Sequence, residues 1–396
     1  MKKGLKIALC ILCALVLFAG GALVASYLTT QRLYQQLQLD PVTAKAAEVS
    51  AYLSAYYIDT YDETALADAA ASAMVDATGD PWSYYLSAAD YQSYEESMEN
   101  AYVGIGITIL ASEEDGGFLI DDVTPGGPAA QAGILIGDVL FEIEGQDALS
   151  LGASGARALV RGEEGTTVSL KLRRGEEVLE LAIPRARIAV DVATGRMLDG
   201  QLGYVKISNF DERCFDETSA CIDALLAQGA KGLIFDVRFN GGGYRDELVK
   251  LLDKLLPEGI LFQSEDYSGK KETDTSDASC LALPMAVLVN RESYSAAEFF
   301  AAALQEYDWA EVVGEKTTGK GRFQTGFRLS DGSLLNLSIG KYYTPQGRSL
   351  TDLGVTPDLE VALDEQAYLA CYQEKLPDAE DAQLQGAIGI LMDKIS

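Results

Sequence analysis

Residues 285–298 read MAVLVNRESYSAAE, an apolar run followed by a polar turn and the start of a second apolar segment. A short apolar run that ends in turn residues is typical of a buried strand, and the following SAAEFFAAALQEY is typical of an amphipathic helix. Similar strands and helices alternate from about residue 203 onward, which predicts an α/β unit with a mainly parallel sheet. Sites in such sheets lie at the carboxyl ends of strands, and residues 240–243 and 293–295 occupy two of these junctions.

Ser295 lies at the second junction, immediately before the predicted helix. A hydroxyl group there is exposed at the edge of the sheet, and the helix N-terminus behind it favours a developing oxyanion. Ser295 and Glu298 also fit a capping box, which is a purely structural helix start. This segment alone therefore leaves a nucleophile and a helix cap as open alternatives.

The chain contains no histidine. This excludes Ser-His-Asp and Cys-His catalysis, the HExxH metalloproteases and nearly every histidine-ligated metal site. Lysine is then the only plausible base for a serine nucleophile, and Lys320 lies between two glycines downstream of Ser295. In an extended segment Gln324 projects from the same face as Lys320, so its amide is placed to hold the amine. These residues predict a Ser295–Lys320 dyad that uses no metal and no cofactor.

Residues 102–187 have a different pattern, with short β-rich runs separated by Gly, Pro and Asp, which indicates a small mixed β domain. Within it, GIGI at 104–107 and GPAAQAGILIGD at 127–138 resemble the carboxylate-binding loop and the following helix and turn of a PDZ domain. Glycines let backbone N–H groups approach a terminal carboxylate, and the next strand can pair with the incoming peptide. The predicted peptide-binding residues are Gly104, Ile105, Gly106 and Ile107. Each isoleucine taken singly is as readily interpreted as a core residue.

Taken in order, these segments resemble the C-terminal processing (tail-specific) serine protease family, whose members combine a PDZ domain with a Ser/Lys catalytic unit. The family pattern of a serine, a lysine within GKG and a glutamine four residues later falls on Ser295, Lys320 and Gln324. The runs DPWSYYLS, DVRFNGGG, YYTPQGR and GVTPD match as well, so the resemblance extends from about residue 80 to the end of the chain.

The resemblance implies further roles. It assigns an oxyanion hole to the backbone N–H groups of Gly242 and Ser295, and it gives Arg161 a part in coupling the two domains, although Arg161 also reads as a solvated turn residue. It implies a protease core of the ClpP/crotonase-like type. The sequence departs from the family in three places: the usual Asn-Pro-Gly-Gly reads NGGG at 240–243, the usual small residue before the catalytic serine is Tyr294, and the usual glycine before that run is Glu292.

The N-terminus reads MKKGLK and is followed by an uncharged apolar run, which predicts a cytoplasmic segment at 1–6 and a transmembrane anchor at 7–28. Lysines before the run keep the N-terminus in the cytoplasm. Cleavage near Ala25, which would leave a secreted form, is the alternative. We expect a single-pass protein of the cell membrane, of bacterial type, whose catalytic domain is extracytoplasmic.

The complete prediction is a multidomain α+β protein. After the membrane anchor it has a helical N-terminal region (29–99), a PDZ domain (100–187), an α/β Ser/Lys protease core (188–365) and a C-terminal helical segment (366–396). A net charge of -29 excludes nucleic acid as a partner, because binding to phosphates needs clustered Lys and Arg. The sequence leaves a homodimer open.

The predicted function is that of a membrane-anchored serine endopeptidase, which captures protein or peptide substrates by a free, apolar C-terminus and cleaves them. A catalytically silent PDZ scaffold is the alternative, and the joint presence of Ser295, Lys320 and Gln324 argues against it. Acyl transfer or β-lactam chemistry on a Ser-Lys pair is a third class of activity. Those enzymes place lysine three residues after serine, and no such motif occurs at this site.

Overall fold

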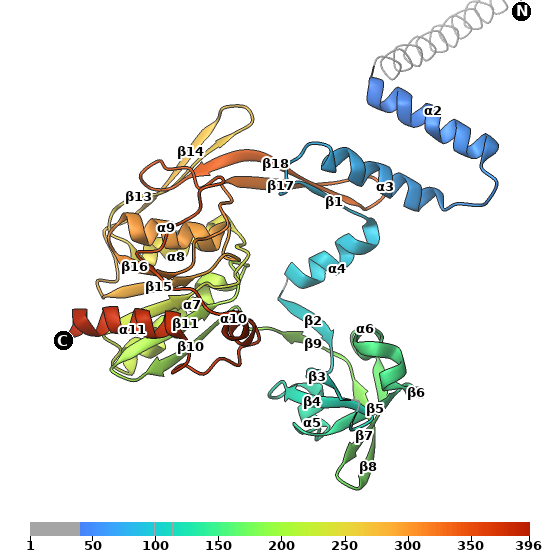
Figure 1. Ribbon diagram of the computed structural model, residues 1–396, viewed down its shortest axis with the longest axis horizontal. Coiled ribbons are helices and arrows are strands. Elements are labelled where there is room, and N and C mark those ends of the chain that lie inside the picture. Colours follow the sequence, from blue (N-terminus) through green and yellow to red (C-terminus); the bar gives the residue numbers. More distant parts are fainter. Residues whose placement is uncertain (1–39, 99, 113) are drawn as a thin grey trace, which may run out of the picture. The chain divides into compact units, whose positions relative to one another are not determined.

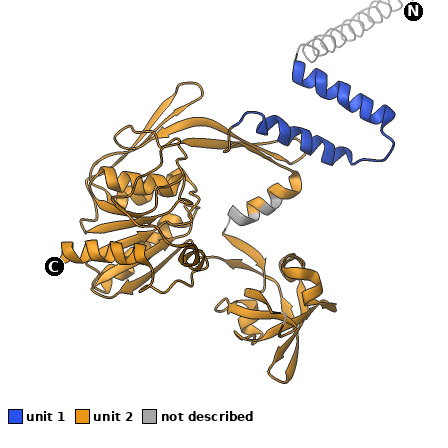
Figure 2. Cartoon of the chain, viewed as in Figure 1, with its two compact units in different colours: residues 1–79 blue, residues 80–396 orange. Residues whose placement is uncertain are grey.

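The computed structural model describes residues 40–98, 100–112 and 114–396. The predicted cytoplasmic segment (1–6) and anchor (7–28) lie outside these residues. Within the described ranges, no helix has both the length and the apolar composition needed to cross a bilayer. The chain forms two compact units, residues 1–79 and residues 80–396 (Figure 2).

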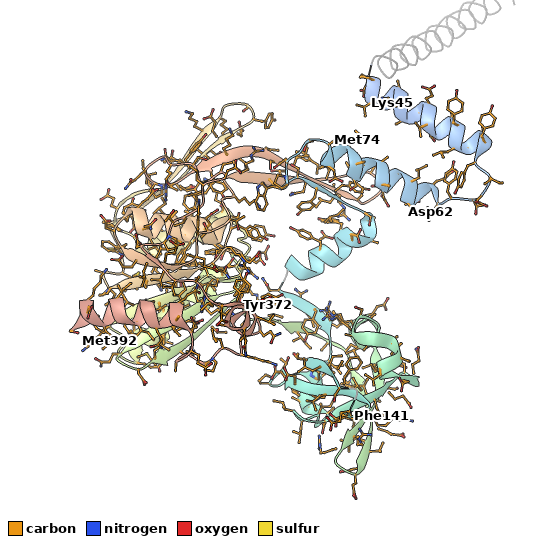
Figure 3. The ribbon with its side chains drawn as sticks, viewed as in Figure 1. Lys45, Asp62, Met74, Phe141, Tyr372 and Met392 are labelled. Atoms are coloured by element: carbon orange, nitrogen blue, oxygen red, sulfur yellow. The ribbon has the colours of Figure 1, made fainter. Side chains whose placement is uncertain are left out.

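The described part of the first unit consists of two helices, α2 (Pro41–Tyr56) and α3 (Glu63–Asp76). Each begins with an aspartate cap: the carboxylate of Asp40 accepts a hydrogen bond from the N–H group of Val42, and that of Asp62, which is labelled in Figure 3, accepts from two N–H groups of the first turn of α3. Such caps stabilise a helix start by about 1 kcal/mol. The predicted N-terminal helices are confirmed.

The second unit opens with β1 (Tyr84–Leu86) and α4 (Ala88–Met98). The sequence predicts only helices here. The strand forms because Tyr84 and Tyr85 favour extended backbone and pair antiparallel with β18 (Leu334–Tyr343). Together they join an antiparallel sheet in the order β1-β18-β13-β14, with β17 also paired to β18; the further strands are β13 (Gly259–Asp266), β14 (Lys271–Ser276) and β17 (Arg322–Arg328).

The PDZ-like part is a small sheet in the order β3-β4-β5-β7-β8, with β6 paired to β5 and a separate antiparallel pair of β2 and β9 (Figure 1). Apolar side chains from the sheet and its helices form a core of their own. Its elements are β2 (Ala101–Gly104), β3 (Ile107–Ser112), β4 (Gly117–Val123), α5 (Pro128–Gln131), β5 (Val139–Ile143), β6 (Gln146–Asp147), α6 (Ala148–Val160), β7 (Thr167–Arg174), β8 (Glu177–Pro184) and β9 (Ala186–Ala189).

The α/β core is a six-stranded sheet in the order β10-β11-β12-β15-β16-β19, parallel from β11 to β19 and antiparallel between β10 and β11 (Figure 1). Its strands are β10 (Ala193–Leu198), β11 (Leu202–Ile207), β12 (Gly232–Asp236), β15 (Met285–Val289), β16 (Ala310–Gly314) and β19 (Leu359–Glu360). The helices are α7 (Cys214–Ala227), α8 (Arg245–Leu255), α9 (Ala296–Glu306), α10 (Glu365–Tyr372) and α11 (Ala382–Ile395).

Successive residues of the central strands face opposite sides of this sheet. In β12, Phe235 packs with α7, α8 and α9, while Ile234 packs with α11, and β15 alternates in the same way with Val287 and Leu288. Because both faces are covered by helices, these strands are apolar throughout, as the sequence indicates. The predicted α/β core is confirmed, and α11 of the C-terminal segment is one of its two layers of helices.

A buried cluster of charges fastens α11 to the sheet. The guanidinium group of Arg238 donates to the carboxylate of Asp236 at 3.0 Å and 2.5 Å, to that of Asp381 at 3.1 Å and to the side-chain oxygen of Gln383 at 3.0 Å. The phenol of Tyr204 donates to Asp236 at 2.7 Å. Burial by itself would raise the pKa of Asp236, but the charge and hydrogen bonds of Arg238 hold that pKa below its usual value. The carboxyl end of β12 is therefore tied to the start of α11.

Replacing Arg238 by alanine should destabilise the protein by about 3–5 kcal/mol, because Asp236 and Asp381 would remain buried without a counterion. Lys394→Ala is the control, since Lys394 pairs with Glu311 through side chains that are 44% and 36% exposed. An exposed pair of this kind contributes less than about 1 kcal/mol. Urea unfolding of both variants measures the difference, and equal losses would contradict the structural role of Arg238.

Candidate active site

The turn between β15 and α9 is fastened to the loop that follows β12. The hydroxyl group of Ser293 donates to the carbonyl of Val237 at 2.7 Å and accepts from the N–H group of Asn290 at 3.1 Å. The side-chain oxygen of Asn290 accepts from the N–H groups of Phe239 and Glu292 at 3.0 Å and 3.1 Å. Sequence reasoning assigns no role to Asn290 or Ser293, although both are buried polar residues at a strand end. They fix the turn after β15 to the loop after β12.

Ser295 occupies the N-cap position of α9 with φ 58° and ψ -125°. A non-glycine residue in such a sparsely populated conformation carries strain of about 1–3 kcal/mol and is held by its surroundings. Its side chain makes no capping hydrogen bond, so the capping-box alternative is not what the structure contains. Gly242, with φ 91°, lies directly opposite: a Cβ atom there would be 3.0 Å from the Ser295 hydroxyl oxygen. Only a glycine allows this approach.

Glu298 connects the helix that carries Ser295 to the segment that carries Lys320. Its buried carboxylate accepts from the Thr317 hydroxyl group and from the N–H groups of Gly319 and Lys320, the last two at 2.7 Å and 2.9 Å. Burial raises the pKa of Glu298 to about 7, while these hydrogen bonds act in the opposite direction. Sequence reasoning treats Glu298 only as a cap. The sequence feature that could have identified Glu298 is its position three residues after a candidate nucleophile, on the same side of the helix.

The Lys320 amine lies among aromatic rings. Its nitrogen is 4.8 Å from the ring centre of Trp82 and 5.8 Å from that of Tyr294. Burial lowers the pKa of Lys320 to about 8, and the negative charge of Asp80 works against that change. The attraction between an ammonium group and a ring face also favours the charged form, so desolvation is the larger effect here. A lysine in this setting is partly neutral near pH 8.

The Gln324 side chain lines the same cavity as Lys320 but forms its hydrogen bonds with other groups. Its side-chain nitrogen donates to the carbonyl of Arg322 at 3.2 Å and to the Ser338 hydroxyl group at 3.0 Å, and no hydrogen bond joins it to the amine within the described ranges. The pairing of β17 with β18 shifts register between Phe323 and Gln324. Such an irregularity breaks the alternation of side chains on which the sequence prediction relies.

The two amides predicted for the oxyanion hole differ in this structure. Among the described residues, the N–H group of Ser295 has no hydrogen-bond acceptor, so it is available. That of Gly242 donates to the side-chain oxygen of Asn240 at 2.8 Å. Tyr342 lies behind the site: its buried phenol donates to the carbonyl of Lys320 and interacts with the Ser295 hydroxyl group.

Ser295, Lys320, Gln324 and Gly242 all line one cavity of about 1610 Å³. The cavity walls also include aromatic residues from β1 and α4 and the opening of α8. A pocket of this size, with a strained serine beside a partly desolvated lysine, is suited to hydrolysis of an extended polymer such as a peptide.

In the PDZ-like part, Gly104 ends β2 and Ile107 begins β3. Ile105 is fully buried in the core of this part, so its side chain is a core residue and does not face a bound peptide. The carbonyl groups of Ile105 and Gly106 accept from the N–H groups of Ala129 and Thr124, which fixes the loop to its surroundings. Strand β3 is at one end of the sheet order, so its outer edge is open to an added strand.

Arg161 ends helix α6 and is exposed. Its guanidinium carbon lies 4.9 Å from the ring centre of Tyr102 in β2. The side chain thus contacts the two-stranded ribbon through which the PDZ-like part continues into the rest of the unit.

Comparisons with known proteins agree with this architecture. Residues 201–361 match Peptidase family S41 and residues 119–174 match the PDZ domain, which confirms the PDZ prediction. The carboxy-terminal processing protease CtpA of Bacillus subtilis is 34% identical over 319 residues, 80% of this chain and 68% of that protein. The chloroplastic carboxyl-terminal-processing peptidase 2 of Arabidopsis thaliana is 31% identical over 336 residues, 80% of this chain and 65% of that protein.

The carboxyl-terminal-processing protease of Synechocystis is 31% identical over 325 residues, 80% of this chain and 75% of that protein. The solved structure of a candidate S41 protease from Bacteroides fragilis shares the fold, with a TM-score of 0.53 and 20% identity over 82% of this chain and 90% of that one.

Hydrolysis at this site should increase with pH through about 8, because the neutral amine of Lys320 is the base predicted from the sequence and burial lowers its pKa to about 8. The neutral form is present above that pH and is lost below it. Protonation of Glu298, with a pKa of about 7, weakens its hold on the Lys320 segment and should steepen the fall at lower pH. We would measure kcat/KM on a short peptide from about pH 5 to about pH 10, with circular dichroism at each point. A profile that is already flat from about pH 6 would contradict a lysine base.

Proposed function

The chain belongs to peptidase family S41, the serine-type carboxyl-terminal processing peptidases, and on that premise we propose that Ser295 and Lys320 form its catalytic dyad. The observation that carries the proposal is the conformation of Ser295. It is held at positive φ at the N-terminus of α9, it faces Gly242, and it shares a cavity with the half-buried Lys320. Strain of this kind is characteristic of nucleophiles in strand-to-helix turns.

In the proposed reaction, neutral Lys320 takes the proton of the Ser295 hydroxyl group as its oxygen attacks a peptide carbonyl. The N–H groups of Ser295 and Gly242 stabilise the charge that develops on the carbonyl oxygen. The Lys320 ammonium group then gives its proton to the departing amine, which leaves an acyl group on Ser295. Water, activated by the again neutral Lys320, hydrolyses this ester and restores the enzyme.

Two adjustments must accompany substrate binding. No hydrogen bond joins the Lys320 nitrogen to the Ser295 oxygen in the described part of the chain, and transfer needs a separation of about 2.6–3.2 Å. The N–H group of Gly242 must also turn from Asn240 towards the substrate. We infer that capture of a substrate tail by the PDZ domain drives both changes, with Arg161 on Tyr102 as the coupling contact and Gln324 drawn towards the amine.

We further propose that substrates enter by their C-termini. The N–H groups of the Gly104–Ile107 loop would hold the terminal carboxylate, the open edge of β3 would pair with the tail, and Ile107 would contact an apolar terminal side chain. The relatives named as C-terminal processing proteases support this assignment.

For the location, we propose a cell-membrane protein whose protease faces away from the cytoplasm. The support is the sequence of residues 1–28, lysines followed by an uncharged apolar run. Alkaline carbonate extraction of membranes that contain the full chain tests the anchor, because a chain released by carbonate would not span the bilayer.

Ser295→Ala and Lys320→Ala should each lower kcat by a factor on the order of 10³ or more without changing the fold, and the double variant should lose no more than either alone. The two groups serve one chemical step, so their losses do not add. Lys316→Ala, at an exposed lysine of the same segment, is the control and should keep full activity. A Lys320→Ala enzyme that cuts peptides at the normal rate would refute the dyad. Both variants should still bind peptides.

Amidating the C-terminus of a model peptide should weaken its binding roughly 10–100-fold, since charge-assisted hydrogen bonds to a carboxylate contribute about 1.5–3 kcal/mol. Binding is measured with the Ser295→Ala enzyme and cleavage with the unaltered enzyme. Peptides that end in a charged residue serve as a second comparison. Equal binding and equal cleavage of the free and amidated peptides would show that the PDZ domain does not capture chain ends.

A further inference from the structure

Two of the positions at which the sequence departs from the family pattern, Gly241 and Tyr294, lie against each other. A Cβ atom at Gly241 would lie 2.6 Å from the phenol oxygen of Tyr294 and 2.9 Å from the carbon that bears it. Gly241 does not have a positive φ, so its backbone alone does not require glycine. A larger residue at this position would therefore have to displace the Tyr294 phenol.

The ring that occupies this space also faces the catalytic lysine. Tyr294 and Trp82 have ring centres 5.5 Å apart at an angle of 36°, and both lie within 6 Å of the Lys320 nitrogen, at 5.8 Å and 4.8 Å. Trp82 comes from the segment before β1, more than 200 residues away from Tyr294 in the sequence. All three side chains line the same cavity.

We propose that Trp82 and Tyr294 form an aromatic cover that keeps water from the Lys320 amine, and that Gly241 is glycine in this chain because it leaves room for that cover. Both aromatic side chains are thus positioning residues that act through the base. The inference rests on the proposed role of Lys320 and deepens it.

Other charged or titratable groups lie near the lysine, and the negative charge of Asp80 favours its ammonium form. Asp80 forms an ion pair with Arg322 at 3.6 Å. Glu298 accepts from the backbone N–H group of Lys320, and the Tyr342 phenol donates to its backbone carbonyl. Glu298 and Tyr342 thus contact the backbone of Lys320, whereas the two aromatic rings and the charge of Asp80 act on its amine.

The cover makes a directional prediction. Removing a ring admits water to the amine, which favours the ammonium form and moves the pH midpoint of kcat/KM upward. Removing a ring also removes its attraction for the ammonium group, and that loss alone would move the midpoint downward. A shift upward therefore supports the cover, and a shift downward or none at all overturns it.

The first experiment compares Tyr294→Ala and Trp82→Ala with the matched variants Tyr294→Phe and Trp82→Phe. We expect the alanine variants to raise the midpoint by about one pH unit or more while activity recovers at high pH, and the phenylalanine variants to keep it, because a ring remains over the amine. Reaction of Lys320 with trinitrobenzenesulfonate, followed by mass spectrometry as a function of pH, gives the same midpoint without relying on catalysis.

The second experiment tests the fit between Gly241 and Tyr294. Gly241→Ala should displace the tyrosine ring and raise the midpoint as Tyr294→Ala does, whereas the double variant should resemble Tyr294→Ala alone, because the added methyl group then meets no ring. Additive shifts would overturn the matched pair. If Lys320→Ala is inactive and the alanine variants leave the midpoint unchanged, the cover is wrong and the dyad stands. If Lys320→Ala retains activity, the dyad itself is wrong.

Discussion

The buried charge of Arg238 is the constraint on which the arrangement of the catalytic cavity depends. A guanidinium group removed from water must be paired on every side, and its partners come from the end of β12 and the start of α11. The last helix of the chain is therefore part of the core, and the loop after β12 leaves the sheet in a defined direction. That loop carries Gly242 to its place opposite Ser295.

The second constraint is the backbone of Ser295. Its strained conformation persists because Ser293 and Asn290 bind the turn to the neighbouring loop, and the adjoining apolar strand and helix are buried. Glu298 then uses the same helix to hold the segment of Lys320. The proposed nucleophile and base are consequently both held by α9, which is how a site limits the reorganisation needed at the moment of reaction.

A lysine base near neutral pH requires a dry environment, and here the rings that surround the amine come from two distant parts of the chain. Exclusion of water lowers the pKa of Lys320, whereas the attraction between the rings and the ammonium group raises it. The pKa of about 8 for Lys320 reflects the predominance of desolvation. In the substrate-free arrangement the amine rests on aromatic faces, so catalysis needs a movement that binding of a peptide can supply.

The sequence by itself determined what is local or compositional. The absence of histidine left lysine as the base, the alternation of strands and helices indicated a parallel sheet, and the glycine motifs indicated a PDZ domain. Tertiary structure decided which groups meet. Gln324, beside an irregular pairing, bonds Arg322 and Ser338, packing buried Ile105, and Glu298 accepts hydrogen bonds from residues about twenty positions later in the chain. Short-range patterns specify backbone conformation, whereas the neighbours of Trp82, Tyr294 and Arg238 depend on contacts between distant segments that form only when the whole unit packs.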